Sequence, residues 1–207
     1  MINLSVEKVR KSYGARRVLR DVTLAGQGGE VVAVTGPNGS GKSTLLKIVA
    51  GLVRPTQGAV KLTTSAGDQS EPGLRRRSVG YAAPDVVLYP ELSARENLEF
   101  FARVRGLRVT TTQINERLVQ VGLGGRGEDF VGAYSSGMRQ RMRLLLALLH
   151  DPDVLLLDEP GLALDEAGVT LVSDIVAQQT ARGGLTLMAT NDAREAQMGT
   201  RTVALGI

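Results

Sequence analysis

Nine consecutive residues combine glycines, a lysine and hydroxyl side chains at a spacing that suits phosphate binding. Glycines allow backbone N–H groups to approach phosphate oxygens closely. In this pattern the lysine reaches the β- and γ-phosphates, and the serine hydroxyl that follows it binds Mg²⁺. The pattern therefore predicts a site for a nucleoside triphosphate with Mg²⁺. The residues are Gly36, Pro37, Asn38, Gly39, Ser40, Gly41, Lys42, Ser43 and Thr44, called the phosphate loop below.

The segments on either side of the phosphate loop fit this interpretation. Residues 30–35 are rich in β-branched side chains and are bounded by glycines, which predicts a buried strand. Residues 43–50 place apolar side chains on one helical face. A helix that begins at the loop points its positive N-terminal end at a bound anion. Strand, glycine loop and helix are the context that the motif requires.

A second group of chemically suitable residues follows an apolar run at 154–157. This run predicts a buried parallel strand, and it ends in the carboxylates Asp158 and Glu159. Ligands of open α/β sheets bind at such strand ends. We expect Asp158 to hold Mg²⁺ and Glu159 to orient and polarise an attacking water. Lys42 and Glu159 are therefore candidate catalytic residues for hydrolysis of a nucleoside triphosphate.

The composition is that of an ordinary globular protein. The 207 residues are 43% hydrophobic and 22% charged, with no cysteine. No apolar run approaches the roughly 18 residues that span a bilayer, and the N-terminus lacks a secretory pattern, so we expect a cytoplasmic protein. The net charge is +4, but aromatic residues make up only 3%, which argues against platforms for base stacking. No nucleic-acid partner is expected.

The order of the predicted elements indicates a single α/β domain over residues 1–207. Alternating patterns near the N-terminus predict a small antiparallel sheet, and βα units follow it. An all-helical block at about 88–150 interrupts these units, and residues 63–73 are polar and predict an exposed loop. Strands are expected at 2–9, 18–24, 30–35, 60–64, 78–82, 154–157, 185–189 and 202–205, and helices at 43–50, 93–105, 111–121, 136–150 and 166–181.

Five motifs in order give the chain a family resemblance. It resembles the nucleotide-binding domain of ATP-binding cassette (ABC) ATPases over essentially its whole length. The resemblance implies a P-loop NTPase fold, with a RecA-like, mostly parallel sheet, a small antiparallel β subdomain and an inserted helical subdomain. In chain order the motifs are Tyr13, the phosphate loop, Tyr134-Ser135-Ser136-Gly137-Met138, Asp158-Glu159-Pro160 and Leu162-Ala163-Leu164-Asp165.

The resemblance also implies ligands and roles. Tyr13 would stack on the adenine of ATP, and Ser43 and Asp158 would hold Mg²⁺. Ser135, Ser136 and Gly137 belong to the family's signature, which faces the nucleotide held by the other protomer of a dimer. Asp165 closes the loop that contacts that dimer partner. The signature differs from the family pattern Leu-Ser-Gly-Gly-Gln at three positions, but serine in place of the first glycine still leaves room for phosphate.

Two further departures from the family pattern concern hydrolysis. Pro84 stands where the family has a glutamine that senses Mg²⁺, and proline offers neither an amide donor nor a side-chain oxygen. Asp85, the next residue, supplies an oxygen for Mg²⁺ if the loop shifts by one position. Asn191 replaces the family's switch histidine; it can donate a hydrogen bond to the γ-phosphate but cannot carry a proton. We expect intact ATP binding and slow hydrolysis.

Three functions are compatible with these residues. The first is the ATPase subunit of a membrane transporter, peripheral on the inner face of the membrane, working as a homodimer or paired cassette. There the 84–93 segment would line a groove for a membrane-spanning subunit. The short length of the chain and its loose resemblance to small haem-exporter cassettes favour export as the direction of transport. The alternatives are a soluble ATP-driven clamp and a nucleotide-gated scaffold with little turnover. The transported substrate and the membrane subunit are not encoded in this chain.

Overall fold

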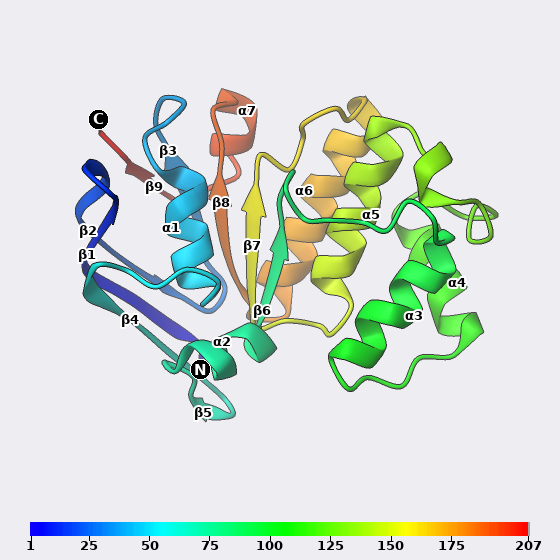
Figure 1. Ribbon diagram of the computed structural model, residues 1–207, viewed down its shortest axis with the longest axis horizontal. Coiled ribbons are helices and arrows are strands. Elements are labelled where there is room, and N and C mark those ends of the chain that lie inside the picture. The colour runs from blue at the N-terminus through cyan, green and yellow to red at the C-terminus, as the bar shows by residue number, and fades with distance from the viewer. Residues whose placement is uncertain (207) are drawn as a thin grey trace.

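Two β-sheets form the framework of the chain. The structure is a computed structural model that describes residues 1–206. One sheet is antiparallel, in the order β2-β1-β4-β5, and the other is parallel, in the order β6-β7-β8-β3-β9. Figure 1 shows the antiparallel sheet beside the parallel one. The strands are β1 (Asn3–Tyr13), β2 (Arg16–Gln27), β3 (Val31–Thr35), β4 (Gln57–Thr64), β5 (Gly67–Asp68), β6 (Val79–Ala82), β7 (Val154–Asp158), β8 (Leu185–Ala189) and β9 (Arg201–Ala204).

Helices connect the strands of the parallel sheet. In Figure 1, α3 and α4 lie at the end of the molecule away from the antiparallel sheet. No helix among residues 1–206 is long and apolar enough to cross a membrane. The helices are α1 (Lys42–Val49), α2 (Pro72–Ser78), α3 (Ala94–Val104), α4 (Thr111–Gln120), the 3-10 turn η1 (Val131–Ala133), α5 (Ser136–Leu148), α6 (Glu166–Ala181) and α7 (Ala193–Ala196).

The two faces of the parallel sheet belong to different cores. Leu156 and Leu187 pack in the core that contains α1 and the antiparallel sheet. Leu155 and Met188, one residue away on the same strands, pack in the core that contains α5 and α6. Successive side chains of a strand point to opposite faces, so strands buried on both faces are apolar throughout. The phosphate-loop helix and the signature helix therefore cover opposite faces of the sheet.

The helical block has its own apolar core, built from α3, α4 and α5. Its first helix begins with the predicted capping box: the Ser93 side chain accepts from the Glu96 backbone N–H, and the Glu96 carboxylate accepts from the Ser93 N–H. Thr110 and Gln113 form a second capping box at the start of α4. Both boxes satisfy backbone donors that a helix start leaves free.

The expected exposed loop over residues 63–73 was only partly right, because the segment contains more regular structure than predicted. Strand β4 continues to Thr64 and turns into the short β5, which pairs with it. Helix α2 then begins at Pro72, where Glu71 accepts hydrogen bonds from two free N–H groups of the first turn. Proline at a first helical position is favourable because its missing N–H would be unpaired there anyway. The sequence analysis missed this helix start because the surrounding residues are polar and were interpreted as a loop.

Candidate nucleotide-binding site

The phosphate loop lies between β3 and α1, with its glycines in conformations that other residues rarely adopt. Gly41, the N-cap residue of α1, has φ +96° and no side-chain cap. A Cβ atom there would lie 2.6 Å from a Leu19 methyl carbon, so the site needs glycine for space as well as for backbone shape. The first N–H groups of α1 are thus left without a side-chain cap, which is the arrangement that binds phosphate.

Lys42 is buried at the bottom of this loop. Its ammonium donates hydrogen bonds at 2.7 Å to the carbonyl oxygen of Gly36 and to Asn191 Oδ1. The Asn191 amide nitrogen in turn donates to Asn38 Oδ1. Because β3 and β8 are neighbours in the sheet, the residues after both strands meet at its carboxyl edge. The structure thus brings Asn191 against two residues of the phosphate loop, Asn38 and Lys42.

The acidic pair lies at the same edge, with Asp158 as the last residue of β7 and Glu159 directly after it. Burial raises the pKa of the Asp158 carboxyl, the nearby carboxylates of Glu159 and Asp85 raise it further, and a hydrogen bond from the Ser43 hydroxyl lowers it. A buried carboxylate with a raised pKa favours a cation beside it. Hydroxyl and carboxylate oxygens are the ligands that Mg²⁺ prefers, so the donor set fits the metal.

Mg²⁺ held here would need further ligands from outside the protein. Within residues 1–206, no group of three or more Asp, Glu or His side chains is arranged to hold a metal. This suits Mg²⁺, which keeps several waters and is usually bound by one or two carboxylates together with substrate phosphates.

Glu159 sits on a tight turn directly after the strand. Its φ is +49°, in the left-handed region that is uncommon for a residue with a side chain. Its backbone N–H donates to the Ala189 carbonyl at 2.8 Å, which ties this turn to the end of β8. The role of Glu159 in activating water stays a prediction. The constrained backbone fixes the point at the sheet edge from which its side chain extends.

Asp85 occupies the neighbourhood that the sequence assigns to the missing glutamine. Its carboxylate pairs with Lys47 Nζ at 2.5 Å, while Pro84 is exposed. Burial first, and then the carboxylates of Asp85 and Asp158, raise the pKa of the Tyr81 hydroxyl. Asp85 therefore lies close to the metal-facing side of the site. Its partner there is a lysine of α1, a contact that sequence reasoning missed.

The signature and the loop before α6 form a separate surface. Ser135 caps α5 by accepting from the Met138 N–H at 3.2 Å, and Ser135 and Ser136 are both exposed. A Cβ atom on Gly137 would lie 3.0 Å from the Ala163 carbonyl oxygen, so the two segments touch. Within one chain this surface and α1 lie on opposite faces of the sheet.

Within this surface the Asp165 side chain connects the start of α6 to α5. Its carboxylate accepts from the Gly168 N–H at 2.8 Å, as the N-cap of α6, and from Arg141 of α5 at 3.0 Å. These contacts lower the pKa of the Asp165 carboxyl. Arg141 also donates to the Val121 carbonyl after α4, so it links the helical block to the start of α6. The expected contact of Asp165 with a dimer partner stays a prediction.

The β1–β2 hairpin carries Tyr13 at its tip. The ring is exposed, and the Lys11 ammonium lies 4.8 Å from its centroid. Arg16 pairs with Tyr13 across the hairpin, and its guanidinium would lie 3.8 Å from a Cβ atom on Gly39. The hairpin therefore reaches the phosphate loop through Arg16. The sequence analysis did not predict this contact, although Arg16 lies only three residues after Tyr13.

These motifs in this spatial order agree with comparisons to known proteins. The profile of the family described as ABC transporter matches residues 19–161. The chain belongs to the ABC transporter family. Its sequence is 40% identical over 177 residues to the uncharacterised ABC transporter ATP-binding protein YxlF of Bacillus subtilis (strain 168), an alignment that covers 84% of this chain and 58% of YxlF.

Two further ABC proteins show the range of the likeness. The sulfate/thiosulfate import ATP-binding protein CysA of Synechococcus elongatus is 37% identical over 166 residues, covering 79% of this chain and 48% of CysA. The chain thus spans about half the length of these curated ABC relatives. A dimeric structure of the ATP-binding cassette MJ0796, bound to ADP and Pi, superposes with a TM-score of 0.85 at 26% identity, over 98% of this chain and 94% of that one.

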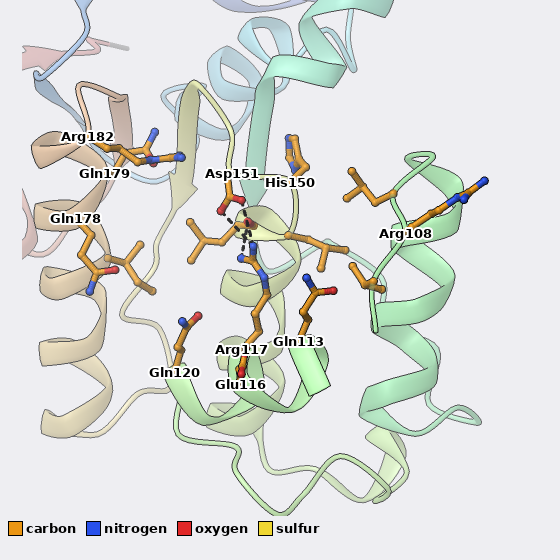
Figure 2. Close-up of a pocket in the computed structure, with 15 residues that line it drawn as sticks. Arg108, Gln113, Glu116, Arg117, Gln120, His150, Asp151, Gln178, Gln179 and Arg182 are labelled. Carbon is orange, nitrogen blue, oxygen red and sulfur yellow. Dashed lines mark hydrogen bonds and ion pairs between the residues drawn. The ribbon is translucent and has the colours of Figure 1, made fainter. Parts of the chain in front are cut away.

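A polar hollow of about 570 Å³ lies elsewhere on this ABC cassette (Figure 2). It opens between α4, the end of α5 and α6, and it holds none of the predicted site residues. Two of its arginines have partners within the protein: Arg117 binds Asp151 at 3.2 Å, and Arg182 donates to Gln179 Oε1. Its described lining residues include no glycine loop and no uncapped helix start, the features that the phosphate loop combines.

Proposed function

We propose that this chain is the nucleotide-binding subunit of an ABC transporter and that it binds and hydrolyses ATP with Mg²⁺. The observation that carries the proposal is the meeting of Lys42, Asp158 and Asn191 at the carboxyl edge of one parallel sheet. The Lys42–Asn191 hydrogen bond joins residues 149 positions apart. It places a phosphate-loop side chain and a side chain from the end of β8 next to each other, where the γ-phosphate is predicted to bind.

Each group at this edge has a distinct task in the proposed reaction. The uncapped start of α1 and the Lys42 ammonium bind the phosphates, while Ser43 and Asp158 hold Mg²⁺. When bound, Mg²⁺ would neutralise charge that develops on the phosphate oxygens. Glu159 orients and polarises the attacking water, and Asn191 donates a hydrogen bond to the γ-phosphate. Phosphoryl transfer needs mainly positioning and charge stabilisation, which these groups supply.

The complete site requires a second cassette. Ser135, Ser136 and Gly137 present an exposed helix start on the sheet face opposite α1, so they cannot reach the phosphate loop of their own chain. We propose that two copies, or two paired cassettes, enclose two ATP molecules between phosphate loops and signatures. The dimeric MJ0796 cassette with ADP and Pi supports this arrangement.

A hollow beside the metal-facing residues is the proposed docking site for a membrane-spanning subunit. It has a volume of about 450 Å³ and is lined by residues 84–88, Pro90, Val131, Arg139 and Arg143, among others. Val87 and Tyr89 of the same segment expose large apolar side chains. Because Asp85 belongs both to this hollow and to the surroundings of Asp158, movement there would reach the nucleotide site. Docking places the chain peripherally on the inner face of the membrane.

Export is the proposed direction of transport, on the strength of the sequence resemblance to haem-exporter cassettes. Relatives of this chain include a protein named for sulfate/thiosulfate import, so membership of the family leaves the direction open. Reconstitution of the chain with its membrane subunit in vesicles would decide the direction. ATP-dependent loss of the substrate from the compartment that holds the cassette would support export.

A nucleotide-gated scaffold with little turnover is the second candidate function. Two observations favour it: Pro84 offers no metal ligand, and Asn191 replaces a group that could carry a proton. The soluble clamp is less well supported. Repair clamps of the family carry long coiled coils between phosphate loop and signature, and α3, with 11 residues, is the longest helix described there.

Phosphate release by the purified protein tests these alternatives. We expect wild-type turnover that depends on Mg²⁺ and is lost in Glu159→Gln, which keeps the shape of the side chain but cannot act as a base. Equal rates for the two proteins would favour the scaffold. Purification of Glu159→Gln from membranes with ATP should recover a membrane-spanning protein; recovery of nucleic acid or ribosomes would contradict the transporter proposal.

A further inference from the structure

A buried carboxylate joins the two loops that carry Glu159 and Asn191. Glu195 lies in α7, directly after the Asn191 loop, and its side chain is only 6% exposed. Its Oε1 accepts from the Gly161 N–H at 2.7 Å, two residues after Glu159. Its Oε2 accepts from the hydroxyl of Thr190, which is 1% exposed and precedes Asn191. One side chain thus spans both loops.

This carboxylate is placed at a cost in free energy. A buried charge is unfavourable unless hydrogen bonds or an opposite charge compensate for its lost hydration. No ion pair to Glu195 occurs among residues 1–206, and the neighbouring Arg194 binds Asp192 instead. The charge of Arg194 contributes at longer range, and the two hydrogen bonds from the two loops are the direct contacts that compensate the carboxylate. An apolar side chain in this position would leave the Gly161 N–H and the Thr190 hydroxyl without their acceptor, so the carboxylate serves the two loops rather than filling space alone.

The backbone at residue 161 is matched to this contact. A Cβ atom on Gly161 would lie 2.3 Å from Glu195 Oε1, which is too close for any side chain without movement. Glycine therefore lets the carboxylate reach the backbone N–H of the turn after the acidic pair. On the other side, the Thr190 hydroxyl also accepts from the Asp192 N–H at 2.9 Å, which fixes the loop on both sides of Asn191.

We propose that Glu195 is a positioning residue that holds Asn191 against Lys42 at a fixed distance from Glu159. The connection runs from Gly161 through Glu195 and Thr190 to Asn191, whose amide meets the Lys42 ammonium. Glu195 touches neither nucleotide nor metal in this scheme. Its part in turnover rests on the proposed ATPase function, whereas its hold on Asn191 is a property of the protein alone.

The hold on Asn191 is tested by NMR of the protein without nucleotide. The side-chain NH₂ signal of Asn191 is identified by its loss in Asn191→Ala. We expect an order parameter of about 0.8 in the wild type and below about 0.6 in Glu195→Ala, the range of flexible groups. Asp174→Ala removes an exposed carboxylate of α6 and is the matched control, expected to leave the signal unchanged. An unchanged order parameter in folded Glu195→Ala would overturn the proposal.

Steady-state kinetics then tests the consequence for turnover. In Glu195→Ala we expect kcat to fall by about tenfold or more, since small displacements of catalytic groups are costly, with the Kd of an ATP analogue changed by less than about threefold. In an Asn191→Ala background the same substitution should have no further effect on kcat.

The isosteric Glu195→Gln covers the case in which the alanine variant does not fold. It retains an acceptor for the Gly161 N–H, and toward Thr190 it replaces the charged acceptor by an amide NH₂ that can only donate to the hydroxyl oxygen. Because a hydrogen bond to a charged group is the stronger one, we expect an intermediate loss of kcat. An active wild type with kcat unchanged in both folded Glu195 variants, or equal losses with and without Asn191, would overturn the proposal. A wild type without turnover would contradict the ATPase function instead, and the NMR result would still decide the role of Glu195.

Discussion

The Lys42 ammonium and Asn191 Oδ1 are joined by a hydrogen bond of 2.7 Å that links the phosphate loop to the end of β8. The amide nitrogen of Asn191 also has a partner in the loop, since it donates to Asn38. An uncharged amide thus occupies the place where the family pattern has histidine. It can donate and accept hydrogen bonds, but it cannot gain or lose a proton at physiological pH.

Replacing Asn191 by histidine should raise the rate of hydrolysis. An imidazole can both contact the γ-phosphate and carry a proton, and proton transfer by a positioned side chain is worth about 10²–10⁴-fold in favourable cases. We expect Asn191→His to raise kcat by about tenfold at saturating MgATP, measured by phosphate release. Asn191→Ala, which removes the hydrogen bonds, should lower it. A kcat for Asn191→His that is equal to or below the wild-type value would refute slow hydrolysis through Asn191.

Removing the charge of Asp85 should weaken the binding of Mg²⁺. The Asp85 carboxylate raises the pKa of Asp158, so it contributes negative potential where the metal is expected, although Lys47 offsets part of it. We expect Asp85→Asn to raise the Mg²⁺ concentration for half-maximal ATPase activity by about fivefold, which corresponds to about 1 kcal/mol. Asp174→Asn is the matched control. An unchanged Mg²⁺ titration would show that Asp85 serves Lys47 alone.

The Asp158 carboxyl should destabilise the protein at neutral pH when no metal is bound. Burial is the main cause of its raised pKa, so the folded protein holds the proton more tightly than the unfolded chain does. Stability from this group therefore falls as pH rises from the unfolded value of about 3.9 through the raised folded pKa. We expect Asp158→Asn to raise Tm at pH 7.5 in EDTA by about 2–4 °C, the equivalent of about 1 kcal/mol.

The pH dependence of the stability difference shows whether the charge of Asp158 causes the destabilisation. Below about pH 3.9 both states of the wild type are protonated at residue 158, so the stability difference between wild type and Asp158→Asn should shrink as pH falls. Calorimetry at several pH values measures this trend. A variant that is less stable than the wild type at pH 7.5 would mean that the Ser43 hydrogen bond outweighs burial and repulsion.

The contribution of His150 to stability should change with pH in the opposite direction to that of Asp158. It lines the hollow of Figure 2, and burial, followed by the charge of Arg105, lowers its pKa to about 4. Its Nε2 lies 3.1 Å from the Arg105 guanidinium, which can only donate, so the ring is neutral there. The unfolded chain takes up a proton below about pH 6.5, and the folded protein does not until about pH 4. Stability from this group is therefore lost as pH falls through that window.

Urea unfolding of His150→Gln measures this contribution. Glutamine can accept from Arg105 but does not titrate. Between pH 7.5 and pH 5.0 the wild type should lose more free energy of unfolding than the variant, by on the order of 1 kcal/mol after allowance for partial exposure. Equal losses in the two proteins would show that His150 is protonated in the folded state at pH 5.

The sequence by itself determined the parts of this protein whose geometry depends on adjacent residues. The phosphate loop is one continuous segment, and the strand before it and the helix after it were both predictable from local pattern. The capping box at Ser93 was equally local. Where the local signal was weak, as at the start of α2, polar composition was mistaken for a loop.

Tertiary structure alone decided which distant residues meet. The strand order β6-β7-β8-β3-β9 differs from the order along the chain, and it is set by packing on both faces of the sheet. That order brings Asn191 to Lys42 and lets Glu195 join Thr190 to Gly161. It also separates α1 from the signature helix. The motifs therefore specify what can bind, and the sheet decides which groups share one site and which must be supplied by a second copy.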